Sequence, residues 1–83
     1  MNKLQAISLY DSKTNTFTPP FFAPTVDSAR RDFGILVNDG KSLQSTHAAD
    51  FDLYHVGEFD TTTAVFRSFD KIHLANGVDV KIK

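Results

Sequence analysis

Three prolines within six positions constrain the fold of this chain more than any other sequence feature: Pro19, Pro20 and Pro24. Proline has no backbone N–H to donate to a β-ladder, and its ring clashes with the preceding turn of a helix. Residues 19–24 are therefore predicted to form an extended edge or loop segment. Successive side chains of an extended segment point to opposite sides. We expect one of Phe21 and Phe22 to fill the gap between helix and sheet, and its neighbour to point outward.

The stretches on either side of the prolines differ in period. Residues 3–10, KLQAISLY, alternate loosely and end in the turn formers DSKTN, which predicts a strand, a turn and a return strand at 16–18. After Pro24, Thr25 can cap a helix, and apolar residues then recur at three- to four-residue spacing. The helix is predicted near 25–38 and ends at NDG, with Gly40 left-handed. Its apolar stripe comprises Val26, Ala29, Phe33, Leu36 and Val37.

Residues 50–82 show two hairpin patterns. The segment DFDLYHVGEFDTTTAVFRSFD predicts a hairpin near 51–69 with Thr61 and Thr62 at its tip, which sets Gly57 opposite Phe66. The pair Asn76-Gly77 predicts a further hairpin near 71–82, with Gly77 left-handed. Alternation along the first hairpin assigns these residues to its core face: Leu53, His55, Gly57, Phe59, Ala64 and Phe66.

The predicted fold class is α+β. A small antiparallel sheet, with hairpins near 3–18, 51–69 and 71–82, packs on one main helix near 25–38, and residues 41–50 are mostly loop. Eighty-three residues with 41% hydrophobic content suit one domain, 1–83, close to the lower size limit for a single core. Domains this small often gain burial by oligomerising, so a homodimer is expected.

The composition indicates the cellular compartment that this chain suits. The chain has no cysteine, which excludes disulfides and thiolate metal sites and suits a reducing cytoplasm. The N-terminus lacks an apolar signal segment, and no apolar run approaches 18 residues. We therefore expect no signal peptide, no membrane span and no membrane partner.

Catalytic and metal-binding patterns are weak. His47, His55 and His73 show no ligand-like spacing, so no metal is expected. The four glycines are isolated, which excludes a phosphate loop or a dinucleotide fingerprint, and no cofactor is expected. The serines form no nucleophile elbow, and Glu58 is the only glutamate. The sequence therefore predicts a protein that is not an enzyme.

Two places combine aromatic and basic residues, the mixture that binds single-stranded nucleic acid. One is Phe21 and Phe22 with Arg30 and Arg31. The other is the second face of the 51–69 hairpin, which carries Tyr54, Arg67 and Phe69. Each has a plainer interpretation. The two helical arginines lie beside Asp27 and Asp32 and can form a solvated helix face, and the hairpin face equally resembles half of a homodimer interface.

The net charge of −1 is not the basic signature of most nucleic-acid-binding proteins, so any phosphate contact must come from a local patch. From the residues alone, dimer contact is preferred over base stacking for the hairpin face.

Three stretches carry a family resemblance: PPFF at 19–22, ARRDFGILVND at 29–39 and DFDLYHVGEFD at 50–60. In order, spacing and size they resemble the small non-structural protein of gokushovirus-type microviruses, phages with circular single-stranded DNA. The resemblance covers roughly residues 3–70, and the DFDLYxxGxFD block is its specific part. It implies a non-catalytic protein of the host bacterial cytoplasm that acts on viral single-stranded DNA or its replication complex, in genome synthesis or packaging.

Two hypotheses result. In the first, a dimeric accessory protein binds single-stranded DNA. Its phosphate-binding cations would be Arg30, Arg31, Arg67, Lys41 and Lys71. Its base-stacking rings would be Phe21 or Phe22, and Tyr54 or Phe69. In the second, the chain is a protein-interaction module, a scaffold or regulator that docks on a phage or host replication protein without touching DNA.

Overall fold

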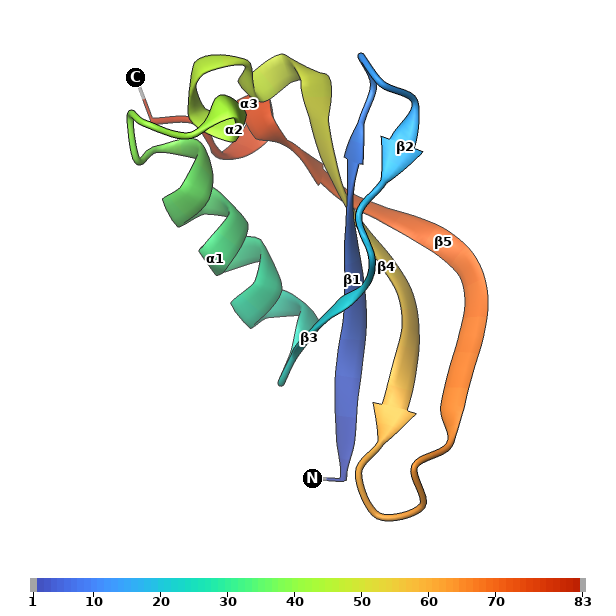
Figure 1. The fold of residues 1–83 in the computed structure, drawn as a ribbon. Helices are drawn as coiled ribbons and strands as arrows, with labels where there is room; N and C mark the ends of the chain where they lie inside the picture. Colours follow the sequence, from blue (N-terminus) through green and yellow to red (C-terminus); the bar gives the residue numbers. More distant parts are fainter. Residues whose placement is uncertain (1, 83) are drawn as a thin grey trace.

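The computed structural model describes residues 2–82 and shows an α+β fold, which confirms the predicted fold class (Figure 1). Its antiparallel sheet has five strands: β1 Lys3–Asp11, β2 Thr16–Phe17, β3 Phe21–Ala23, β4 Phe51–Asp60 and β5 Phe66–Asn76. The helices are α1 Val26–Val37, α2 Leu43–Thr46, α3 Gly77–Val80 and the 3-10 turn η1 Ala48–Asp50. Within residues 2–82, none of these helices has the length and apolar character needed to cross a membrane.

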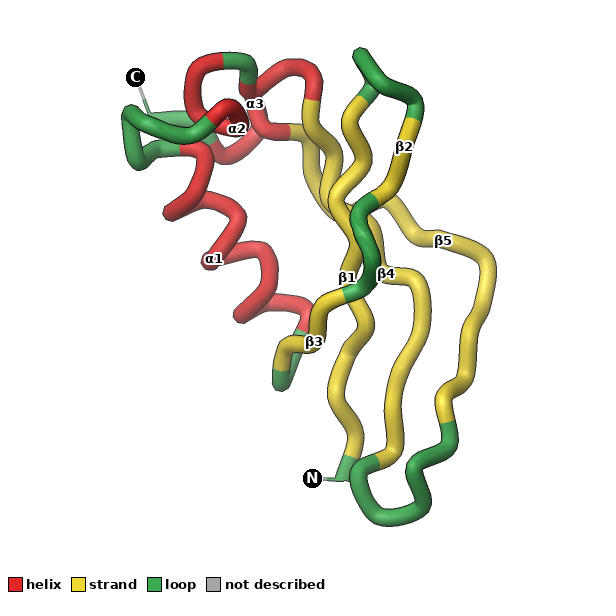
Figure 2. The backbone as a smooth tube through the Cα atoms, viewed as in Figure 1, coloured by secondary structure: helices red, strands yellow, loops and turns green. Residues whose placement is uncertain are grey.

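The proline-rich segment behaves as its composition predicts. The sheet runs β2-β1-β4-β5, and β3 also pairs with β1, so β2 and β3 follow one another along the same strand. The prolines lie between these short strands and after β3, where no ladder N–H is required (Figure 2). Phe21 pairs with Ile7 and Phe22 with Ala6. Because Ala6 and Ile7 are adjacent in β1, the two phenylalanines lie on opposite faces of the sheet, as expected.

Helix α1 forms where the sequence predicts it. Thr25 is its N-cap, and a capping box joins Thr25 and Ser28. The buried side chains of α1 are Ala29, Phe33 and Val37, which pack on one face of the sheet. The sheet residues of this core cluster are Ile7, Leu9, Ala23, Phe51, Leu53 and Ala75. Gly40 then adopts the predicted left-handed conformation, with φ 75°.

The predicted hairpin near 71–82 is wrong. Residues 66–76 form one continuous strand, and the chain then turns into α3. Asn76 caps this helix, because its side chain accepts a hydrogen bond from the N–H of Val78 and its N–H binds Asp79. Gly77 has no positive φ; it is needed because a Cβ there would collide with the backbone carbonyl of Ala48. An Asn-Gly pair serves an N-cap and a close backbone approach as readily as a hairpin turn.

The register of the first hairpin also differs from the prediction. Phe66 pairs with Phe59, and Gly57 with Ser68, so the connection is longer than a tip at Thr61 and Thr62 would allow. The ring of Phe66 nevertheless lies over Gly57, since a Cβ added there would approach it to 3.0 Å. The contact that the sequence predicts between Gly57 and Phe66 therefore forms diagonally instead of directly across the ladder.

A β-bulge redistributes the faces of β4. Gly57 pairs with Ala6 and His55 with Ile7, so Val56 is an extra residue on β4. Ala6 and Ile7 point to opposite faces, and therefore so do Gly57 and His55. The predicted core face of the hairpin is wrong for this reason. Leu53 and His55 face α1, whereas Gly57 and Phe59 lie on the other side, which we call the open face.

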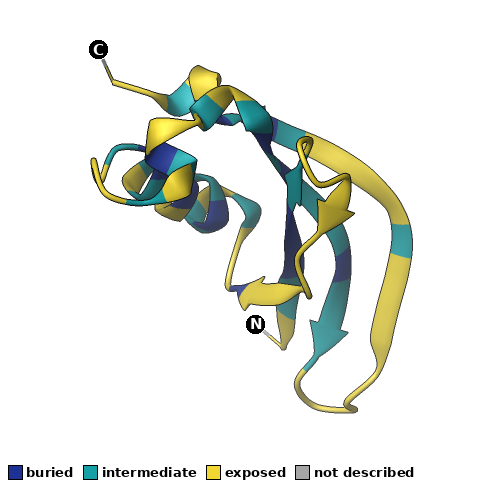
Figure 3. Ribbon diagram, turned by 45° about the horizontal axis from the view of Figure 1, so that its top comes forward, coloured by how far each residue is buried: buried dark blue, intermediate teal, exposed yellow. Residues whose placement is uncertain are grey.

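Helix α1 covers only part of the sheet. The end of the β4–β5 hairpin projects beyond it, with its residues largely exposed (Figures 1 and 3). We call this projecting part the free half: residues 3–6 of β1, 55–60 of β4 and 66–72 of β5. The remainder, the covered half, holds the core. The two halves differ in what lies against the helix-side face, whereas no helix of residues 2–82 lies on the open face of either half (Figure 1).

Candidate nucleic-acid interface

Four rings gather on the open face over the covered half, and we call them the Tyr54 cluster: Tyr10, Phe17, Tyr54 and His73. Tyr10 pairs with Phe17 across the β1–β2 ladder, and Tyr54 pairs with His73 across the β4–β5 ladder. The ring centroids of Tyr10 and Phe17 lie 4.6 Å apart, those of Phe17 and Tyr54 5.4 Å, and those of Tyr54 and His73 5.3 Å. These tilted and edge-on contacts form one continuous aromatic surface.

The short β2 strand is fixed against β1 by side-chain hydrogen bonds. The Ser8 hydroxyl donates to the carbonyl of Thr18 at 2.8 Å, and the Thr18 hydroxyl accepts from the N–H of Leu9 at 3.0 Å. The Tyr10 hydroxyl donates to Oδ1 of Asn15 at 2.8 Å. Phe17 is consequently held in the cluster although it remains 42% exposed.

A cation lies beside this aromatic surface. The ammonium of Lys71 is 5.9 Å from the centroid of the Phe17 ring, within the range of a cation–π contact. Asp52, which pairs with Tyr10 across the β1–β4 ladder, has its Oδ1 2.8 Å from Nε2 of His73 and orients the imidazole. The Tyr54 cluster therefore combines stacking surfaces with positive charge, the chemistry that single-stranded nucleic acid requires.

A second aromatic group, which we call the Phe66 patch, lies on the open face of the free half: Phe22, Phe59 and Phe66. Phe22 lies 5.8 Å from Phe59 and 6.1 Å from Phe66, measured between ring centroids. Phe22 and Phe66 remain 46% and 45% exposed. None of these three rings has a charged or hydrogen-bonding group, so this patch is apolar where the Tyr54 cluster is mixed.

The predicted grouping of Tyr54 with Arg67 and Phe69 is wrong. Tyr54 is on the open face, but Arg67 pairs with Glu58 on the helix-side face of the free half. Phe69 follows Arg67 there: its ring lies 4.8 Å from His55 and 5.7 Å from the guanidinium carbon of Arg67. The bulge at Val56 is the cause, because it reverses the alternation on which the prediction depends.

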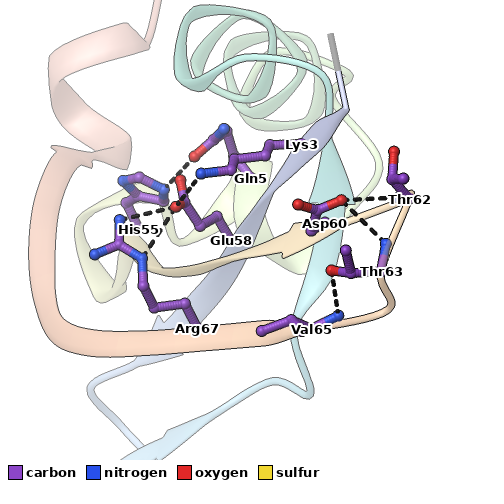
Figure 4. Close-up of polar contacts among 9 residues, drawn as sticks. All are labelled: Lys3, Gln5, His55, Glu58, Asp60, Thr62, Thr63, Val65 and Arg67. Carbon is purple, nitrogen blue, oxygen red and sulfur yellow. Dashed lines mark hydrogen bonds and ion pairs between the residues drawn. The ribbon is translucent and has the colours of Figure 1, made fainter.

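Arg67 forms an ion pair with Glu58. Its Nε and Nη2 donate to Oε1 of Glu58 at 3.0 and 2.8 Å, and Lys3 approaches the same oxygen at 3.4 Å (Figure 4). The hydrogen bond from Arg67, with a smaller contribution from Lys3, lowers the pKa of Glu58 below its ordinary value. His55 lies beside this group, with Nε2 2.8 Å from Oε1 of Gln5. Arg67 therefore belongs to a surface ion-pair network.

The helical arginines lie away from both aromatic groups. Arg30 forms an ion pair with Asp27 at 3.0 Å, and Arg30 and Arg31 border an open groove between α1 and the C-terminal segment. The apolar lining of the groove is Gly34, Ile35, Val80 and Ile82. Lys41 lies in the loop after α1, where its N–H and that of Ser42 donate to Asp39. These hydrogen bonds, that from Ser42 first, lower the pKa of Asp39.

Phe21 and Phe22 lie on opposite faces of the sheet, but neither ring is buried. Phe21 does lie between sheet and helix, beside Leu9 and Phe33. It fills this gap only partly, because it is 44% exposed, almost as much as Phe22 on the open face.

Residues 4–80 match the model of the family described as Phage ORF5 protein. The chain belongs to this family. The match runs from β1 to the end of α3, so it contains both aromatic groups and the ion-pair network of the free half. A comparison with curated proteins finds no match, and neither does a comparison with solved structures.

The site of this phage family member includes residues that sequence reasoning missed. Tyr10, Phe17 and His73 were not among the candidates, whereas Tyr54 and Lys71 were. A signal was available for the first two, because Tyr10 and Phe17 flank the turn formers DSKTN and become cross-strand neighbours if the turn closes a hairpin. His73 carried no such signal, since it was assigned to a hairpin that does not form. Within residues 2–82, no group of three or more potential metal ligands is present.

Proposed function

We propose that this phage protein is a non-catalytic accessory protein that binds single-stranded DNA on the Tyr54 cluster. The observation that carries the proposal is the continuous aromatic surface of Tyr10, Phe17 and Tyr54 with the ammonium of Lys71 above one ring. Bases stack on such rings whatever their sequence, and a neighbouring cation meets the backbone phosphates. The resemblance to the small non-structural protein of gokushovirus-type microviruses adds a role in viral genome synthesis or packaging in the bacterial cytoplasm.

The geometry favours one set of the candidate contacts over the others. Lys71 and Tyr54 lie on the same surface, whereas Arg67 is bound to Glu58 and Arg30 to Asp27. A phosphate approaching either arginine would compete with a carboxylate that is already in place. We therefore assign the principal phosphate contact to Lys71, and the principal stacking contacts to Tyr54 and Phe17.

Fluorescence anisotropy with labelled single-stranded and double-stranded oligonucleotides tests this function. We expect preference for the single strand and a steep loss of affinity with salt, with a log–log slope of about −0.7 for each phosphate neutralised. Replacing Tyr54 by Ala should cost about 1–3 kcal/mol of binding free energy, the usual value of one stacked base.

Matched charge reversals test whether DNA contacts Lys71 beside the Tyr54 cluster or cations elsewhere on the molecule. Lys71→Glu should weaken binding and reduce the salt slope, while Lys41→Glu, at an exposed loop lysine away from the cluster, should have little effect. The double variant Arg30→Glu/Arg31→Glu tests the helical arginines in the same way. Absence of binding at low salt, or equal losses from Lys71→Glu and Lys41→Glu, would refute the assignment.

A protein-interaction module without DNA contact is the second candidate. The pairing of Arg30 and Arg67 with carboxylates favours it, because two of the five cations proposed for phosphate already have an ion-pair partner. This candidate predicts no salt-sensitive affinity for oligonucleotides and a partner among phage or host replication proteins.

A further inference from the structure

The ladders of β1, β4 and β5 set the open-face side chains in three consecutive rows. The first row is Ser8, Tyr54 and His73, the second is Ala6, Gly57 and Ser68, and the third is Leu4, Phe59 and Phe66. The Tyr54 cluster lies on the first row and the Phe66 patch on the third, with the row of small residues between them. Neighbouring rows are two residues apart on β1, so the first and third rows are separated by about 13 Å.

The rings of the Phe66 patch cover this middle row. Ala6 is 0% exposed, although no helix within residues 2–82 covers its face of the sheet (Figure 1). Phe22 is its partner on β3, and the ring centroids of Phe22 and Phe66 lie 6.1 Å apart. A Cβ added to Gly57 would meet the Phe66 ring at 3.0 Å. These two rings therefore extend over the second row, and the aromatic surface continues from the third row to the edge of the first.

The same rings remain accessible from outside. Phe22 and Phe66 are 46% and 45% exposed, close to the 42% of Phe17 in the Tyr54 cluster. Their contacts with each other and with Phe59 are tilted or edge-on, which leaves part of each ring free. Rings that are held by their neighbours and half open to solvent can stack unpaired bases.

One cation lies between the two ring groups. The pairs His55–Ile72 and Gly57–Ser68 leave three residues of β5, 69–71, opposite a single residue of β4. This bulge sets Lys71 between the second and first rows, and its ammonium lies 5.9 Å from the centroid of the Phe17 ring. A nucleic-acid strand that passed from one ring group to the other would therefore carry a phosphate past this lysine.

Two of the carboxylates near this surface are already bonded. Glu58 binds Arg67 on the helix-side face, and Asp52 lies against His73. Asp70, in the same bulge as the lysine, forms no ion pair within residues 2–82. It is the acidic side chain that opposes a phosphate here, so Asp70→Asn should strengthen binding to a polyanion.

We propose that the single-stranded DNA bound on the Tyr54 cluster continues over the Phe66 patch, where Phe22 and Phe66 stack further bases. Lys71 would meet the phosphate between the two ring groups. The inference rests on the proposed function and extends its site to a second aromatic group. The outer rows are separated by about four nucleotides, at the rise of about 3.4 Å per nucleotide of a stacked strand. A strand that contacts both groups is therefore longer than one that covers the Tyr54 cluster alone.

Fluorescence anisotropy with labelled oligothymidines of about 4 and about 12 nucleotides is the experiment. For the longer strand, Phe66→Ala should weaken binding about 5-fold or more, the lower end of what one stacked base contributes. For the shorter strand, which the Tyr54 cluster accommodates alone, the affinity should stay nearly unchanged. The matched control is Phe69→Ala, the same substitution in the same strand on the opposite face, which should change neither affinity.

Photochemical cross-linking keeps the test valid if Phe66→Ala disturbs folding, which circular dichroism would reveal. The wild-type protein is irradiated with the longer strand carrying iododeoxyuridine in place of thymidine, and mass spectrometry identifies the modified residues. We expect cross-links at Phe22 or Phe66 in addition to those at Phe17 or Tyr54.

The outcomes separate this inference from the proposed function. A wild type that binds neither strand at low salt refutes both. Weaker binding of the longer strand by Tyr54→Ala but not by Phe66→Ala, with cross-links confined to the Tyr54 cluster, overturns this inference alone. Equal losses from Phe66→Ala and Phe69→Ala also overturn it. So does a dimer in sedimentation velocity that Phe66→Ala weakens while DNA affinity is unchanged, because the patch then joins two copies of the chain.

Discussion

Leu53 and His55 stand two residues apart on the same face of β4, yet one belongs to the core and the other does not. Leu53 is 1% exposed beneath α1, while His55 is partly exposed and bonded to Gln5 at the edge of the free half. The covered half is therefore a two-layered structure, and the free half is a ribbon whose two faces carry an ion-pair network and a phenylalanine patch. The difference shows that the length of α1, not the strands, sets the limit of the core.

The largest effect should come from truncating the covered half. Leu53→Ala removes a side chain buried against the helix and should cost about 2–5 kcal/mol of unfolding free energy. His55→Ala, on the same strand in the free half, should cost about 1 kcal/mol or less, because it removes one hydrogen bond and a partly exposed ring. Urea denaturation followed by circular dichroism measures both. Equal costs would show that the free half is packed as tightly as the covered half.

Two glycine substitutions compare the stability of the free half with that of helix α1. Gly57→Ala in the free half should destabilise by about 1–3 kcal/mol, because the new Cβ would lie 2.6 Å from the carbonyl oxygen of Arg67 and 3.0 Å from the Phe66 ring. Gly34→Ala in α1 should stabilise by about 0.5–1 kcal/mol, since its nearest neighbour, Cβ of Val80, is at an ordinary 3.8 Å. Thermal unfolding compares the two variants, and the same sign of change for both would contradict the expectation.

A smaller loss of stability is expected from removing the N-cap of α3, the short helix that follows β5. Asn76→Ala removes the cap of α3 and the hydrogen bonds of the side-chain amide to Ala49 and Asp52, and should cost about 0.5–2 kcal/mol. The control is Thr61→Ala at the end of the free half, whose hydroxyl donates to the exposed residue Asn2 and should contribute about 0.5 kcal/mol or less. Hydrogen exchange should show the loss of protection concentrated in residues 76–80.

The smallest effect concerns the ion-pair network of the free half. Because Arg67 lowers the pKa of Glu58 in the folded state, ionised Glu58 stabilises the fold above its unfolded pKa, near 4.5. That contribution is lost as the pH falls through the lowered folded value. The stability difference between the wild type and Glu58→Gln should therefore be present at neutral pH and shrink below about pH 4.5. A difference that persists unchanged at acid pH would exclude the charge interaction.

The local elements of the fold were predictable, because the signals for them are local. The capping residues at Thr25, the apolar spacing up to Val37 and the prolines at 19–24 each act within a few residues. The third hairpin was not predictable, because Asn76-Gly77 satisfies two different local structures. Its contacts with Ala48, Ala49 and Asp52, distant in sequence, favour the helix cap.

In the candidate site, too, the individual residues could be predicted from local sequence, but their grouping could not. Tyr54 and Lys71 were both candidates, but the sequence grouped Tyr54 with Arg67 and Phe69, which lie on the other face of the sheet. A one-residue bulge at Val56 exchanges the faces of everything beyond it on the strand, and period-2 alternation contains no sign of it. Tyr10 and Phe17 enter the Tyr54 cluster through the pairing of β1 with β4, which joins segments more than forty residues apart.

Four properties could be predicted from the residues alone: the α+β class, the position of α1, the extended proline segment and the placement of Phe21 and Phe22 on opposite faces. These properties follow from backbone chemistry and short-range periodicity, which each residue carries with it. Three other properties became visible only in the folded chain: which rings share a face, which cations pair with carboxylates and where the core ends. They depend on ladder register and on how far α1 reaches over the sheet, and both are set by contacts between distant parts of the chain.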